Sequence, residues 1–224
     1  MTTLLFDIDG TLIRTGGAGM QAIGQAFESL FGTDELPTVK VHGRTDEGIL
    51  SDIFEFHSRD YNQHRDDFNH AYWSRLPTTL RETEGYVLPG VEQLIDRLVQ
   101  LNSVHLGLLT GNSQRAAKIK LQHFQLDNRF SFGGFGDHHA DRNDVARLAM
   151  ESAIASVEAE LVRERVWVIG DTVNDIVCAR SIGAKVLVVE TGGSSRDDLE
   201  SAQPDAMMST LEDANHFFQL VGLG

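Results

Sequence analysis

The chain has 224 residues, which is long enough to bury a good core in one large domain or two small ones. Hydrophobic residues make up 41% and charged residues 23%, which is ordinary for a soluble globular protein. The formal net charge of −14 argues against nucleic acid or an anionic membrane as a partner, because both require a basic surface. A phosphate site in this chain must therefore be a local exception, made by a few cations, backbone amides or a metal ion.

The sequence carries one cysteine, Cys178, which excludes a disulfide within the chain and fits a reducing compartment. The first ten residues, MTTLLFDIDG, lack the basic region of a signal peptide, and no apolar run approaches membrane-spanning length. We expect a cytoplasmic protein that binds neither nucleic acid nor membranes, and we predict a monomer or a weak homodimer.

The first predicted element is a buried strand at residues 3–6, which leads directly into Asp7 and Asp9. Two carboxylates this close repel each other, and ionising both in a low-dielectric site is costly without a counter-charge. Because Asp-Gly is also a common turn signal, the pair either lies in a solvated turn or is held together by a cation. The remainder of the sequence decides between these alternatives.

Between residues 15 and 86 the sequence shows helical patterns and no convincing strand. Apolar residues recur at helical spacing in 19–31 and 45–56, and a more polar pattern covers 66–76. Thr45 is the predicted N-cap of the second of these helices. We predict a small helical domain at residues 16–85, inserted into a core formed by residues 1–15 and 86–224.

The remaining elements alternate between helices and apolar strands. Their Val and Leu content without strict alternation suits strands that are buried on both faces. The predicted strands are residues 104–109, 166–170 and 185–190, with a weaker candidate at 129–135, and predicted helices cover 91–101 and 114–124. This alternation predicts an α/β core with a doubly wound, Rossmann-like parallel sheet.

Polar residues follow several of these strands directly. Asp7 and Asp9 end the first strand, Thr110 ends the second, and Asp171 ends a later one, with Asp175 four residues further on. In an open parallel sheet, ligands bind outside the carboxyl ends of the strands. Taken singly, these residues could cap helices or end strands without function, but together they favour a site for Mg²⁺, a hard cation that prefers oxygen ligands and commonly binds phosphate as a further partner.

The sequences DIDGT, LLTGN and GDTVND, in this order, resemble the motifs of the haloacid dehalogenase superfamily. The helical insertion matches a cap domain placed after the first motif. The resemblance implies that Asp7 is the nucleophile, that Asp9 is the general acid and base, and that Thr110 binds the transferring phosphoryl group. It also implies a Mg²⁺ ion held by Asp7, the Asp9 backbone carbonyl and Asp171, with Asp175 in support. Four further motif residues are expected to bind the substrate: Gly10, Thr11, Gly111 and Asn112.

The family normally places a lysine after the third strand, and this chain departs from that pattern. Lys118 and Lys120 fall on the helix after Asn112, which is the wrong element. Arg142, just before a helical pattern, carries the same charge in a rigid fork suited to phosphate and carboxylate. We predict that Arg142 takes the lysine's role, the alternative being a surface salt bridge.

The resemblance implies a Mg²⁺-dependent phosphatase that acts on a small phosphorylated metabolite through an aspartyl-phosphate, similar to phosphoglycolate phosphatases. In the cap, Arg44 precedes a helix N-terminus in HGRTDEG and is predicted to contact the substrate. One alternative is a sugar phosphomutase similar to β-phosphoglucomutase, which would retain the phosphoryl group. A second alternative is a non-catalytic, Mg²⁺-binding module similar to response-regulator receivers.

Overall fold

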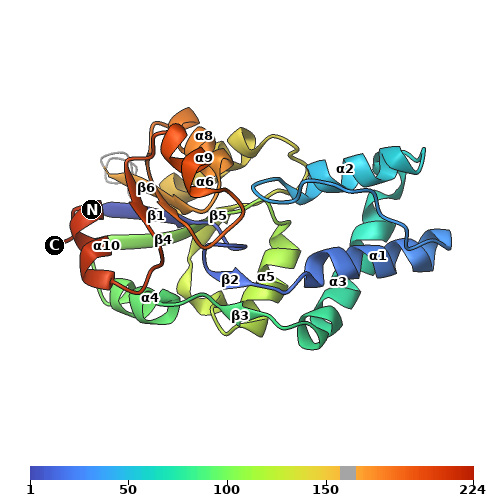
Figure 1. The fold of residues 1–224 in the computed structure, drawn as a ribbon, viewed down its shortest axis with the longest axis horizontal. Coiled ribbons are helices and arrows are strands. Elements are labelled where there is room, and N and C mark those ends of the chain that lie inside the picture. The colour runs from blue at the N-terminus through green and yellow to red at the C-terminus, as the bar shows by residue number, and fades with distance from the viewer. Residues whose placement is uncertain (157–164) are drawn as a thin grey trace.

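A six-stranded parallel sheet lies at the centre of the chain in the computed structural model, which describes residues 1–156 and 165–224 (Figure 1). The strand order is β5-β4-β1-β6-β7-β8, and each neighbouring pair is parallel. The strand bounds are β1 (Thr2–Phe6), β4 (Val104–Leu109), β5 (Phe132–Gly134), β6 (Val166–Gly170), β7 (Lys185–Val189) and β8 (Ala206–Met208). Since the chain winds outward in both directions from the centre, the carboxyl end of β1 opens at a topological switch point, where ligands bind in this architecture.

Helices cover both faces of the sheet because successive side chains of the buried β1 point to opposite sides. Leu4 and Phe6 join an apolar cluster with α4 and α10 on one face, whereas Leu5 joins a cluster with α6 and α8 on the other. The helix bounds are α4 (Val91–Val99), α5 (Gln114–His123), α6 (Arg142–Ser156), α8 (Val173–Ser181), α9 (Arg196–Ser201) and α10 (Ala214–Val221), with a 3₁₀ turn at Asp127–Arg129. The predicted α/β core with a doubly wound parallel sheet is confirmed.

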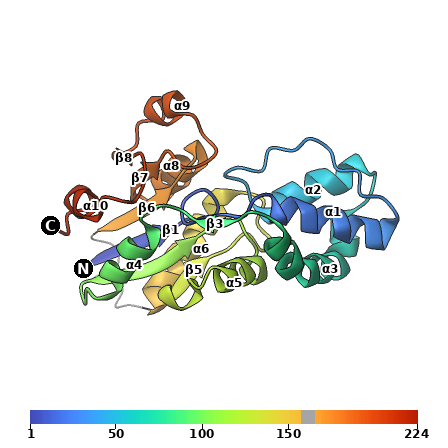
Figure 2. The same ribbon diagram turned by 60° about the horizontal axis from the view of Figure 1, so that its bottom comes forward.

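Three further helices form a separate layer at one end of the sheet, opposite the end that carries both termini (Figures 1 and 2). They are α1 (Ala18–Phe31), α2 (Asp46–Phe56) and α3 (Tyr61–Glu82). Phe27, Phe54 and Phe68, one from each helix, meet with ring centroids 4.8–5.1 Å apart. This helical layer, which we call the cap, therefore has an apolar core of its own.

A short antiparallel ribbon connects the cap to the sheet. It pairs β2 (Ile13–Arg14) with β3 (Tyr86–Val87), next to the predicted limits of the inserted segment. Neither strand was predicted, because two residues are too few to show an alternating pattern. That residues 16–85 form an independent domain stays a prediction.

The cap helix α3 is longer than the pattern at residues 66–76 predicts. The pattern stops before Pro77, a residue that usually ends a helix, but Pro77 lies inside α3. Leu80, one turn beyond Pro77, is buried in the cap core together with Phe68 and Leu76. Tertiary packing thus allows the helix to continue past the proline.

At the start of α2, the Thr45 side chain accepts a hydrogen bond from the Gly48 amide, so the predicted N-cap is confirmed.

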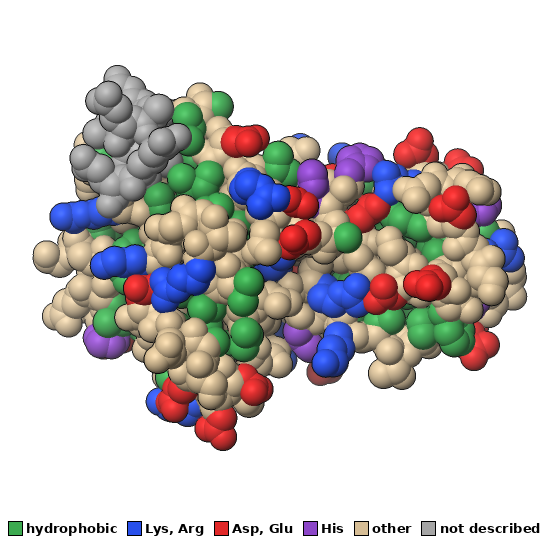
Figure 3. All heavy atoms as spheres, turned by 90° about the horizontal axis from the view of Figure 1, so that it is seen from above, with side chains coloured by type: hydrophobic (Ala, Val, Ile, Leu, Met, Phe, Trp, Pro, Cys, Tyr) green, Lys and Arg blue, Asp and Glu red, His purple; other side chains and the backbone are tan. Residues whose placement is uncertain are grey.

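On the face of the molecule that Figure 3 shows, basic and acidic side chains are interspersed. Among the described helices, none combines the length and the apolar character needed to cross a membrane. The cytoplasmic location and the oligomeric state stay predictions.

Candidate active site

A cavity of about 560 Å³ lies between the carboxyl edge of the sheet and the cap. Its sheet side contains the residues that follow β1 and β4, and its cap side includes apolar side chains of α1, α2 and α3 such as Ile23, Ile49 and Tyr72. Eight of the predicted site residues line it: Asp7, Asp9, Gly10, Arg44, Thr110, Gly111, Asn112 and Arg142. Thr11, Asp171 and Asp175 are buried beside this lining.

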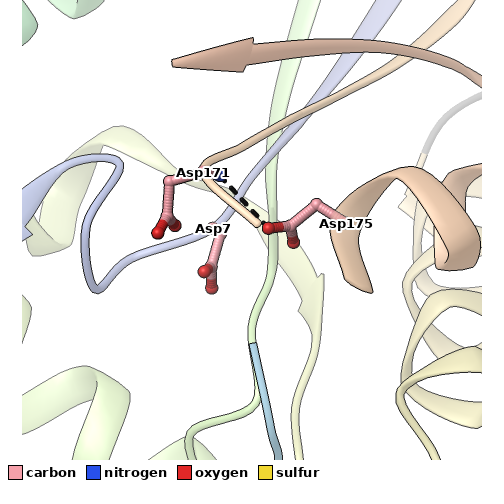
Figure 4. A group of neighbouring side chains, drawn as sticks. All are labelled: Asp7, Asp171 and Asp175. Carbon is pink, nitrogen blue, oxygen red and sulfur yellow. Dashed lines mark hydrogen bonds between the residues drawn. The ribbon is translucent and has the colours of Figure 1, made fainter. Parts of the chain in front are cut away.

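Three buried carboxylates meet at the end of β1 (Figure 4). Asp7 follows β1, Asp171 follows β6, and Asp175 projects from α8; one carboxylate oxygen of each lies within 4.8 Å of the others. Burial raises the pKa of Asp7 despite the nearby Arg142 guanidinium, and burial together with the Asp175 and Asp7 carboxylates raises the pKa of Asp171. Asp7 and Asp171 therefore resist ionisation until further positive charge is supplied.

Asp175 is the most fully bonded member of this cluster. Its Oδ2 accepts hydrogen bonds from the Asp171 amide (3.1 Å), the Thr172 amide (2.9 Å) and the Thr172 hydroxyl (2.7 Å). The bond from the Thr172 amide is part of a capping box at the N-terminus of α8. Its Oδ1 accepts from Arg142 Nη2 at 2.5 Å. Asp175 thus fixes the turn that presents Asp171 and also holds Arg142.

Arg142 begins α6 and reaches into the cluster from the side. Its Nη2 lies 3.2 Å from Asp7 Oδ2, in addition to the contact with Asp175, and its side chain is only 7% exposed. Burial acts to lower the pKa of Arg142, but the two carboxylates outweigh it and hold that pKa well above its usual value. The alternative of a surface salt bridge is therefore wrong, and a permanent positive charge faces Asp7.

Asp171 has no ammonium or guanidinium partner among the described residues. Its carboxylate accepts from the Thr11 hydroxyl at 3.2 Å and from the Gly193 amide at 2.8 Å. At Gly10, whose φ of +89° favours glycine, a Cβ atom would come within 2.5 Å of Asp171 Oδ2, and one at Gly192 would overlap the same carboxylate. Only glycine at these two positions lets the backbone approach the Asp171 carboxylate this closely.

Asp9 belongs to a second network, on the cap side of Asp7. Its carboxylate, 40% exposed, accepts from Lys120 Nζ at 2.7 and 2.9 Å and from Asn112 Nδ2 at 2.7 Å. Lys120, set aside above because of the helix that carries it, thus reaches the site. The one signal in the sequence is spacing, because Ala116 and Lys120 are four residues apart and share the buried face of α5, but this spacing does not reveal that Asp9 faces Lys120.

The cap touches the loop after β4 directly. The Asp46 amide at the start of α2 donates to the Gly111 carbonyl at 2.7 Å, and Asp46 Oδ2 accepts from the Ser113 amide at 2.8 Å. Burial raises the pKa of Asp46. Sequence reasoning missed Asp46, because a first-turn acid on a helix ordinarily faces solvent and the helix macrodipole accounts for it.

Arg44 lines the cavity, but its guanidinium is bound within the cap. Nη1 lies 2.5 Å from Asp52 Oδ2, and Nη2 donates to the Gly48 carbonyl at 3.0 Å. The predicted substrate contact would require Arg44 to leave these partners.

We expect Arg44→Ala and Asp52→Ala to lower kcat/KM by the same small factor. Exposed ion pairs contribute about 0.2–1 kcal/mol, which corresponds to at most about a fivefold effect. Steady-state kinetics on the best substrate of a metabolite panel measures both variants. A large loss in Arg44→Ala that Asp52→Ala does not reproduce would instead show direct contact between Arg44 and the substrate.

Known proteins resemble this chain over nearly its whole length. Residues 4–189 match the family described as haloacid dehalogenase-like hydrolase. The chain is 27% identical to a phosphoglycolate phosphatase of Synechococcus elongatus, over 95% of both chains. It is 23% identical to the pyrophosphatase PpaX of Bacillus cereus, over 95% of this chain and 94% of that protein. The fold resembles that of CbbY from Rhodobacter sphaeroides, solved with phosphate, with a TM-score of 0.72 at 20% identity over 95% and 96% of the two chains.

Proposed function

Because the chain belongs to the haloacid dehalogenase-like hydrolase family, we propose that it is a Mg²⁺-dependent phosphatase of a small phosphorylated metabolite, with Asp7 as the nucleophile. The observation that carries this proposal is the position of Asp7 at the carboxyl end of the central strand, beside Arg142 and on the lining of the cavity. The class of enzyme is supported by two relatives, both phosphatases by name, that match nearly their whole length.

The first step transfers the phosphoryl group to the protein. An Asp7 carboxylate oxygen attacks phosphorus, an O–P bond forms, and the bond between phosphorus and the substrate oxygen breaks. Asp9, in its protonated form at this step, gives that proton to the departing alkoxide. The Thr110 hydroxyl and the Gly111 amide bind the phosphoryl oxygens, and Arg142 balances the charge that gathers on Asp7 and phosphorus.

The second step releases phosphate. Asp9, now ionised, takes a proton from a water molecule whose oxygen attacks phosphorus, and the bond between phosphorus and Asp7 breaks. Inorganic phosphate leaves, and both aspartates return to their starting states.

Asp7, Asp171 and the Asp9 backbone carbonyl would hold the Mg²⁺ ion, with Asp175 orienting Asp171 through its amide. The fit is supported by the oxygen-only donor set and by the raised pKa values of two of its carboxylates. The bound ion would neutralise negative charge on the carboxylates and the phosphoryl oxygens.

The relatives are named for two different substrates, phosphoglycolate and pyrophosphate. Both are small phosphate compounds, and this shared property is what we propose for the present chain. A panel of phosphorylated metabolites, scored by inorganic phosphate release with Mg²⁺ present, would identify the preferred one.

Removal of the metal should abolish activity. In excess chelator we expect phosphate release to fall to background, and added Mg²⁺ should restore it. Asp171→Ala should raise the Mg²⁺ concentration needed for half-maximal activity, or abolish activity, because it removes a ligand that no other described side chain replaces. Full activity in excess chelator would rule out the metal site, and unchanged Mg²⁺ dependence in Asp171→Ala would rule out its assignment as a ligand.

The same assay separates the alternatives. A phosphomutase retains the phosphoryl group and requires a bisphosphate activator, so it would not release phosphate continuously. A receiver-like module would release at most about one phosphate per protein molecule before stopping. Many turnovers without an activator therefore support the phosphatase.

A further inference from the structure

We propose that Lys120 is a positioning residue for the hydrolysis: it holds the Asp9 carboxylate and orients the Asn112 amide so that the Thr110 hydroxyl can donate to the phosphoryl group. The inference rests on the proposed function, and it assigns a role to a residue outside the three sequence motifs. It is carried by a chain of hydrogen bonds from α5 to the loop after β4.

Lys120 is a buried cation whose donors are all occupied. It is 6% exposed, and its Nζ lies within 2.9 Å of both Asp9 carboxylate oxygens and 2.6 Å from Asn112 Oδ1. A buried ammonium is costly unless it is paired, and an ammonium has three hydrogens to donate. The three acceptors match the three donors, so the head group has one defined place.

The contacts with Lys120 and with the Asp9 carboxylate that Lys120 holds decide which way the Asn112 amide faces. An ammonium can only donate, so the amide group toward Lys120 must be the oxygen Oδ1. Nδ2 then points to the other side, where it donates to Asp9 Oδ2 at 2.7 Å and to Thr110 Oγ1 at 2.8 Å. The Asp9 carboxylate can only accept and requires the same orientation, and Lys120 holds this carboxylate as well as Oδ1.

The direction of the Thr110 hydroxyl hydrogen follows from the orientation of the Asn112 amide. Its Oγ1 accepts from Asn112 Nδ2 and, at 3.3 Å, from the Asn112 amide N–H. Two donors occupy both lone pairs, so the hydroxyl hydrogen is left to donate, and Thr110 lines the cavity. A phosphoryl oxygen is an acceptor and suits this hydrogen. If the Asn112 amide were reversed, its Oδ1 would accept the hydroxyl hydrogen of Thr110, and that hydrogen could no longer donate to the phosphoryl group.

The two buried cations of the site therefore serve different aspartates. Arg142 contacts Asp7 and Asp175, whereas Lys120 contacts Asp9 and Asn112. Lys118, two residues earlier on α5, is exposed and provides a matched control on the same helix.

The test compares Lys120→Met with Lys118→Met, using p-nitrophenyl phosphate and saturating Mg²⁺. We expect Lys120→Met to lower kcat by about 10–100-fold, the range for groups that orient a ligating side chain, with KM changed by less than about threefold. Lys118→Met should match the wild type. Thermal unfolding of both variants shows whether the fold is kept, and Lys120→Arg provides a charged replacement if the Met variant does not fold.

A double-mutant cycle with Asn112→Ala tests the route of the effect. If Lys120 acts through the amide, the double variant should lose much less kcat than the product of the two single losses. Fully multiplicative losses, or a folded Lys120→Met protein with wild-type kcat, would overturn the role of Lys120 and leave the phosphatase assignment intact. A wild-type protein that releases no phosphate would overturn both.

Discussion

Asp7→Asn should reduce phosphate release to the background of the assay. The amide that replaces the carboxylate is nearly the same size, but it is neutral and cannot act as the nucleophile toward phosphorus. The variant should fold, because the substitution removes a carboxylate whose pKa is raised by burial and that lies close to two other acidic side chains. We therefore expect the melting temperature not to fall, while the turnover number is lost.

The measurement pairs steady-state phosphate release with thermal unfolding of the same preparation. Asp96→Asn is the matched control, since this exposed carboxylate contacts Arg129 far from the cavity lining. Near-normal turnover by Asp7→Asn would contradict the proposed mechanism at its first step.

Arg142→Ala should lower kcat by roughly 10²–10³, or about 2.7–4 kcal/mol, the typical effect of removing a preorganised donor from a developing charge. Arg142→Lys should recover part of the loss, because the positive charge beside Asp7 is retained while the fork geometry is not. Arg142→Ala also leaves the buried Asp175 without its cation, so stability should fall as well. Kinetics must therefore be measured at a temperature at which the variant is folded.

Two arginines nearby in the sequence are controls for this prediction. Arg129 pairs with Asp96 and Arg147 pairs with Asp144, and both arginine side chains are largely exposed. We expect kcat to stay close to the wild-type value in Arg129→Ala and Arg147→Ala. If either variant loses most of its kcat while Arg142→Ala stays active, the catalytic cation has been assigned to the wrong residue.

The sheet was predictable because its strands are buried on both faces and therefore carry apolar runs that end at polar residues. The strand ends also predict where Asp7, Thr110 and Asp171 meet, since parallel strands bring their carboxyl ends to one edge. The assignment of Arg142 required only that the start of α6 face this edge. The contacts of Arg142 are as expected, and its catalytic role stays a prediction.

Contacts that cross from one layer to another were not predictable in the same way. Lys120 reaches Asp9 because α5 lies between the sheet and the cap, and a single helical pattern does not reveal what faces it. Arg44 binds Asp52 because the loop before α2 folds back on that helix. Such contacts depend on the relative placement of elements, which local periodicity does not encode.

Asp175 complicates the interpretation of variants in this protein. One oxygen caps α8 and the other holds Arg142, yet the side chain is fully buried and lies outside the cavity lining. A screen for loss of activity would rank this position with the nucleophile, although the residue need never meet a substrate. A screen for abundance would rank it with the core. Selection at Asp175 thus acts on activity and on folding stability at once. The tolerance of this position to substitution therefore measures neither requirement alone.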